Sequence, residues 1–165
     1  ILAARPEVRT DALVMGGFSM GAVTALVAGF EDARIAGVVS MAGAPLPDLM
    51  HVTIFNARPP SDESRQWAAN HDVVSQLPHF APKPLLVSHG RNDDMVPFAG
   101  ALRLYEAAKP LYAAHPDRLA LMEYSHTHTV SEAQVHDAVA WIAPFFASAG
   151  MQAPDDDTDL RESAV

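Results

Sequence analysis

The chain has 165 residues, of which 49% are hydrophobic and 19% are charged, a composition typical of one folded globular domain. Its formal net charge of −9 disfavours nucleic acid or an anionic membrane surface as a partner, since both require a basic face. The lack of cysteine in the sequence excludes disulfides and a thiolate nucleophile, and it fits a reducing compartment, for which we predict the cytoplasm.

The hydrophobic pattern alternates between short apolar runs and longer helical segments. Runs typical of buried strands cover residues 12–18, 35–41, 84–88 and 119–124. Helices are expected over residues 22–30, from residue 98 to about 112 with an end or kink at Pro110, and after Ser131, which forms a capping box with Gln134. Strands that alternate with helices predict an α/β fold, with a doubly wound, mostly parallel sheet covered by helices on both faces.

Two regions depart from this alternation. Residues 43–82 contain Pro-rich sequence of mixed polarity, so we expect an excursion over the sheet, a candidate lid or pocket wall, rather than another core unit. The acidic tail over residues 151–165 has too little apolar content to fold, and we expect it to be disordered. The remaining residues, 1–150, are predicted to form one catalytic domain.

The pentapeptide Gly17-Phe18-Ser19-Met20-Gly21 lies between the first expected strand and the first expected helix, where the nucleophile of a hydrolase stands on a sharp turn. Such a turn needs small residues two before and two after the serine, because neighbouring backbone approaches closely. The hydroxyl would project from the carboxyl edge of the sheet, with the Met20 N–H facing the charge on an attacked carbonyl. The alternatives are a chance turn and a phosphate-binding turn, although the spacing Gly-x-Gly-x-x-Gly is absent.

A serine hydroxyl becomes a nucleophile near neutral pH only with a base to take its proton and a carboxylate to orient that base. Asp93 and Asp94 follow the strand at residues 84–88 and would lie on the same edge of the sheet as Ser19. Both could instead cap a turn, because Asn-Asp-Asp is common in turns. The chain order Ser, Asp, His is nevertheless the order of α/β-hydrolases.

Two candidate bases, His126 and His128, stand in the loop after the last expected strand. His128 is favoured because it lies three residues before the helix cap Ser131, and His126 is the alternative. The other histidines are assigned to the surface or to local hydrogen bonding: His51, His71, His79, His89, His115 and His136. His126 and His128, with an aspartate nearby, could also bind a divalent metal, but no His-Glu-x-x-His motif supports this, and we predict neither a metal nor a cofactor.

Three stretches together resemble the α/β-hydrolase superfamily: GGFSMGAVTAL, KPLLVSHGRNDDMVPF and HTHTVSEAQVHDAVAWIAPFF. The resemblance is to small bacterial esterases related to dienelactone hydrolases and to the catalytic domain of prolyl oligopeptidases, and it runs to about Phe146. It implies Ser19 as nucleophile, Asp93 as acid, His128 as base and Met20 as an oxyanion donor. It also implies hydrolysis of a small carboxylic ester through an acyl-enzyme.

The front of the chain departs from this resemblance. Only 18 residues precede Ser19, whereas the resemblance implies several further strands and a second oxyanion N–H from one of their loops. We therefore expect a C-terminal part of a longer hydrolase that is weakly active or misfolded alone, since loss of one oxyanion donor costs roughly 10²–10³ in turnover. Other hypotheses are a non-catalytic truncated hydrolase that acts as a binding module and a serine peptidase of the prolyl oligopeptidase type.

Overall fold

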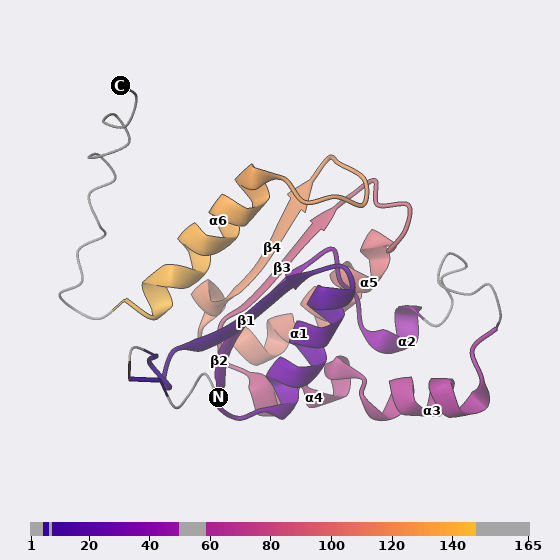
Figure 1. The fold of residues 1–165 in the computed structure, drawn as a ribbon, viewed down its shortest axis with the longest axis horizontal. Coiled ribbons are helices and arrows are strands. Elements are labelled where there is room, and N and C mark those ends of the chain that lie inside the picture. The colour runs from indigo at the N-terminus through magenta and orange to yellow at the C-terminus, as the bar shows by residue number, and fades with distance from the viewer. Residues whose placement is uncertain (1–4, 7, 50–58, 148–165) are drawn as a thin grey trace, which may run out of the picture.

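The computed structural model describes residues 5–6, 8–49 and 59–147 (Figure 1), so the predicted acidic tail lies outside the described residues. One parallel sheet runs through the molecule, with its strands in chain order: β1 (Leu13–Phe18), β2 (Ile35–Met41), β3 (Leu85–Gly90) and β4 (Leu119–Tyr124). All four predicted strands are confirmed. Because the strands are parallel, their carboxyl ends meet at one edge of the sheet.

Helices cover both faces of this sheet, as predicted (Figure 1). One face carries α1 (Met20–Glu31), α4 (Val73–Phe80) and α5 (Phe98–Ala108), and the other carries α6 (Glu132–Ile142). Right-handed crossovers that step across a sheet in one direction place their helices on the same face. The helix that follows the last strand is free to return over the opposite face, which explains the position of α6.

The larger core lies between the sheet and the first group of helices. It contains fully buried aliphatic and aromatic side chains, including Leu26, Val38, Leu85 and Leu104. A smaller core joins Val39 and Leu86 of the opposite sheet face to residues of α6. Complete burial of one such large side chain stabilises the fold by about 1.5–3 kcal/mol, so both layers hold the loops at the sheet edge in place.

The prediction that residues 43–82 contain no core unit is wrong for α4. Val73, Leu77 and Phe80 are at most 1% exposed and lie in the larger core, where the Phe80 ring stacks on Phe30 at 4.2 Å between centroids. The rest of the segment holds α2 (Leu46–Leu49) and α3 (Asp62–Asn70), and α3 buries only Ala68. A lid or pocket wall formed by this part of the segment stays a prediction.

Two helix ends follow the sequence closely. The helix α5 ends just before Pro110, where the chain continues as a 3₁₀ turn over Lys109–Tyr112. Ser131 caps α6 and accepts a hydrogen bond from the backbone N–H of Gln134 at 3.1 Å. The Gln134 side chain contacts Ser88 of the sheet, so the predicted capping box forms one of its two hydrogen bonds. Among the described helices, none has the length and apolar character to cross a membrane.

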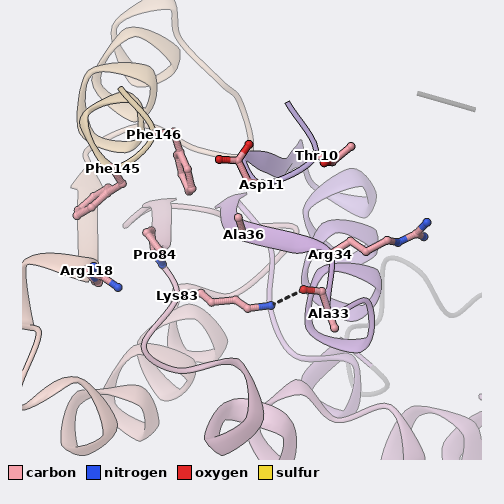
Figure 2. A pocket seen from close by; sticks show the side chains of 10 residues that line it. All are labelled: Thr10, Asp11, Ala33, Arg34, Ala36, Lys83, Pro84, Arg118, Phe145 and Phe146. Carbon is pink, nitrogen blue, oxygen red and sulfur yellow. Dashed lines mark hydrogen bonds between the residues drawn. The ribbon is translucent and has the colours of Figure 1, made fainter. Parts of the chain in front are cut away.

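A pocket of about 330 Å³ opens at the amino edge of the sheet (Figure 2). Its lining combines the start of two strands with the end of the α6 region and includes Ala36, Lys83, Pro84 and Phe146. The Lys83 ammonium donates to the carbonyl oxygens of Ala33 and Ile35 at 3.1 and 2.7 Å. Candidate nucleophile and base residues all follow the carboxyl ends of strands, so this pocket is separate from them.

Candidate active site

Ser19 occupies a strained turn between β1 and α1. Its backbone has φ 55° and ψ −119°, a conformation that costs a residue other than glycine about 1–3 kcal/mol. The Ser19 N–H donates to the Met41 carbonyl at the end of β2 at 2.9 Å, which holds the turn against the neighbouring strand. The position matches the nucleophile elbow that the pentapeptide predicts.

The two glycines of the pentapeptide have different roles. A Cβ atom added at Gly17 would lie 2.3 Å from the backbone of Gly21, so only glycine fits there. A Cβ atom at Gly21 would meet nothing within 4 Å. The expected close approach therefore requires a glycine before Ser19, and it places no such requirement on the glycine after it.

Met20 is the first residue of α1. The amides of a helical first turn have no intrahelical partners, and they sit at the positive end of the helix dipole. The hydrogen bonding of the helix begins at Ser19, because the Ser19 carbonyl accepts hydrogen bonds from the N–H groups of Ala22 and Val23. The turn thus places Ser19 directly before the N–H groups that begin the helix.

The structure brings Ser19, His128 and Asp93 together in one chain of hydrogen bonds. The Ser19 Oγ atom lies 2.8 Å from His128 Nε2, and His128 Nδ1 lies 2.8 Å from Asp93 Oδ2. The His128 side chain is 8% exposed and the Asp93 side chain is fully buried. The Phe18 ring packs against the imidazole of His128 at 4.9 Å between centroids. Contacts at both ring nitrogens and packing on one face therefore fix the orientation of the imidazole.

Backbone amides hold the Asp93 carboxylate in a single orientation. Its Oδ1 atom accepts hydrogen bonds from the N–H groups of Met95 and Val96, at 2.9 and 2.7 Å. Its Oδ2 atom faces His128 and also lies 3.2 Å from His89 Nε2. These donors compensate for the burial of the charge. Asp94, the other candidate acid, is exposed.

Of the two roles predicted for His89, at the surface or in local hydrogen bonding, the structure shows the second. The side chain is fully buried, and its Nε2 atom lies 2.9 Å from the Val96 carbonyl as well as near Asp93. Burial lowers the pKa of His89, although the Val96 carbonyl and the Asp93 charge oppose this. Its position at the end of an apolar strand, four residues before Asp93, is the sequence signal for this role.

His126, the alternative base, contacts other groups. Its Nε2 atom lies 3.0 Å from Gln134 Oε1, and its Nδ1 atom lies 2.9 Å from the Thr127 carbonyl. His126 and His128, the two imidazoles that could together bind a metal, thus contact different groups. Within the described ranges, no cluster of three or more His, Cys, Asp or Glu side chains is arranged to hold a metal ion.

Comparison with known proteins identifies the family. Residues 1–150 match the model of the prolyl oligopeptidase family. The chain belongs to this family. It is 30% identical over 105 residues to Esterase YjfP of Escherichia coli (strain K12), a match that covers 59% of this chain and 42% of that protein. It is 27% identical over 143 residues to Putative esterase YitV of Bacillus subtilis (strain 168), covering 79% and 56%.

The chain thus spans about half the length of these two relatives. Among solved structures, TT1662 from Thermus thermophilus is similar with a TM-score of 0.69 at 24% identity, over 82% of this chain and 55% of that one. A glucuronoyl esterase from Solibacter usitatus gives 0.67 at 17% identity, over 88% and 45%. At these identities the likeness concerns the fold, and it confirms the predicted α/β-hydrolase architecture.

Proposed function

We propose that this member of the prolyl oligopeptidase family hydrolyses small carboxylic esters with Ser19 as nucleophile. The observation that carries the proposal is the hydrogen-bond chain from Ser19 Oγ through His128 to Asp93, with both links at 2.8 Å. The strained backbone of Ser19 at the start of α1 adds independent support. Two relatives named as an esterase and a putative esterase support the ester as substrate class.

The partners of His128 support a role for each of the two side chains, since a carboxylate can only accept a hydrogen bond. His128 donates its Nδ1–H to Asp93, which leaves the lone pair of Nε2 free to take the Ser19 proton. Ser19 Oγ then bonds to the ester carbonyl carbon, while the Met20 N–H stabilises the oxyanion. Protonated His128 gives its proton to the alcohol leaving group, and an acyl-enzyme remains. Water deprotonated by His128 releases the acid and restores the serine.

A second candidate activity is hydrolysis of peptide bonds, since the family that matches residues 1–150 is the prolyl oligopeptidase family. The same three side chains would carry it, because both reactions pass through an acyl-enzyme. The amine leaving group requires more complete protonation by His128 than an alcohol does. A pair of substrates with one acyl group, the p-nitrophenyl ester and the p-nitroanilide, separates the two activities.

A serine-directed phosphonate probe and p-nitrophenyl acetate test the proposal on the folded chain. We expect labelling and ester cleavage that Ser19→Ala abolishes. Ser75→Ala, at an exposed position of α4, is the matched control and should retain both. No labelling of the folded chain would overturn the proposal and favour the binding module. Activity that a chelator removes would favour the metal alternative instead.

A further inference from the structure

Gln134 is a fully buried polar side chain outside the proposed catalytic groups. Its backbone N–H is satisfied by the Ser131 cap, and its side chain spans two further elements. The amide nitrogen lies 2.7 Å from Ser88 Oγ in β3, and the amide oxygen lies 3.0 Å from His126 Nε2. Buried polar groups are held by hydrogen bonds of this kind, so Gln134 joins α6, β3 and the loop after β4.

His126 is held from its other sides as well. Its ring stacks on Tyr124 at 5.4 Å between centroids, with an angle of 15° between the planes. The Tyr124 hydroxyl donates to Asp137 of α6 at 2.7 Å. Gly90 lies directly against the loop, because a Cβ atom there would be 2.3 Å from the His126 carbonyl oxygen. His126 is therefore the residue at which α6 and the ends of β3 and β4 contact and hold this loop.

The loop that is held at His126 also carries His128, two residues later. Its other anchors among the described contacts include Asn92, whose side-chain amide donates to the Ser125 carbonyl at 2.7 Å. His128 is the central residue of a turn closed by the Thr129 N–H, which donates to the Thr127 carbonyl at 2.8 Å. Both polar links of His128, to Ser19 and to Asp93, depend on where this short turn stands.

We propose that Gln134 is a positioning residue that holds His126, and through it the turn that carries His128, within reach of both Ser19 and Asp93. Gln134 contacts none of the reacting atoms and acts through His126. The inference rests on the proposed function for its kinetic consequence, while the placement of His128 is measurable without any substrate. A displacement of about 1 Å at a catalytic group lowers turnover by up to about 100-fold.

The decisive variant is Gln134→Met, which keeps the side-chain volume and removes both hydrogen bonds. We expect kcat for p-nitrophenyl acetate to fall by about 10- to 100-fold with KM nearly unchanged. The low-field NMR signal of the His128 Nδ1–H proton should weaken or disappear. Gln76→Met is the matched control, because it makes the same substitution in α4, outside the helices α2 and α3 that are predicted as a lid or pocket wall, and it should change neither readout.

Gln134→Glu is the rescue variant. One carboxylate oxygen can accept from the His126 Nε2–H, and the other can accept from the Ser88 hydroxyl. It should restore most of the turnover and the low-field proton signal that Gln134→Met loses. Where Gln134→Met fails to fold, His126→Phe replaces it, since phenylalanine preserves the stacking on Tyr124 and removes the contact with Gln134. Where both single variants fold, the double variant should be no worse than the poorer one, as expected for residues that act as a unit.

Turnover within twofold of wild type in Gln134→Met, with the low-field proton intact, would overturn the inference. Equal damage in Gln134→Met and Gln134→Glu would do the same, because only packing would then matter. Failure of the proposed function has a different signature. Wild-type chain would remain unlabelled by the phosphonate, and the NMR signals of the variants would still decide whether Gln134 places His128.

Discussion

Asp93→Asn should disable the proposed hydrolase through the proton positions of His128. The N–H groups of Met95 and Val96 both donate to Asp93 Oδ1, so the oxygen of an asparagine amide must occupy that position. The NH₂ group then takes the place of Oδ2, which is 2.8 Å from His128 Nδ1. Because the NH₂ group donates, Nδ1 of His128 must accept, and the imidazole proton moves to Nε2.

An imidazole with its proton on Nε2 cannot take the proton of Ser19, whose Oγ lies 2.8 Å away. The same substitution in the serine protease template lowers turnover by about 10⁴-fold through the wrong tautomer. A loss of this size corresponds to about 5 kcal/mol of transition-state stabilisation. KM should change little, since Asp93 is buried beneath His128 and offers no surface to the substrate.

Initial rates with p-nitrophenyl acetate measure this loss, and thermal unfolding of each variant verifies that the fold is intact. Asp94→Asn is the matched control, because it makes the same change at the exposed neighbour and should leave turnover within about twofold. A loss below about 10-fold in Asp93→Asn, or an equal loss in Asp94→Asn, would refute the reasoning from the amide orientation.

Three further predictions concern stability. Ser19→Gly should abolish phosphonate labelling and raise the free energy of unfolding by roughly 1 kcal/mol, because glycine adopts φ 55° without strain; lower stability in urea unfolding would contradict this. Gly17→Ala should cost about 3 kcal/mol, since its Cβ would lie 2.3 Å from the backbone of Gly21, whereas Gly21→Ala should change stability by less than about 1 kcal/mol. Burial lowers the pKa of His89, so the unfolded chain binds a proton that the folded chain resists. The free energy of unfolding should therefore fall as the pH drops below about 6.5, by up to about 1.4 kcal/mol per pH unit from this group. In urea titrations on either side of that pH, His89→Gln should reduce the slope and the exposed His136→Gln should leave it unchanged.

The strands could be predicted from the sequence because a parallel strand covered on both faces is apolar at nearly every position. The strands Ile35–Met41 and Leu119–Tyr124 agree with their predicted bounds to the residue. The helix α4 escaped prediction because only three of its eight residues are fully buried, and Pro78 lies inside it. A short helix with one apolar stripe and a proline gives almost the same composition as a loop.

Part of the candidate site could likewise be predicted from the sequence, and part could not. Ser19, Asp93 and His128 could be predicted to lie together because each follows a strand in the chain order of a known arrangement. Gln134 gave only a capping signal, since nothing in the sequence indicates that its side chain turns toward Ser88. The partners of a lone histidine or glutamine depend on which elements pack together, and a single sequence carries little of that information.

The order of the strands places Ser19 and His128 after strands at opposite ends of the sheet. Ser19 follows β1 and His128 follows β4, and three strand spacings of about 4.8 Å each separate the two ends. The loop that carries His128 must therefore fold back over the end of β3, and the side chains of His128 and Ser19 span the rest of this distance of about 14 Å. Gly90 ends β3 without a side chain, and the loop passes through that space, within 2.3 Å of where a Cβ atom would lie. The hydrogen bond from His126 Nε2–H to the Gln134 amide oxygen holds the loop at the start of this return, and the bond from His128 to Asp93 holds it part-way, before it reaches Ser19. A loop that reaches back over a neighbouring strand needs an anchor on each side of the crossing, which is why a buried glutamine remote from the reacting atoms is expected to affect turnover.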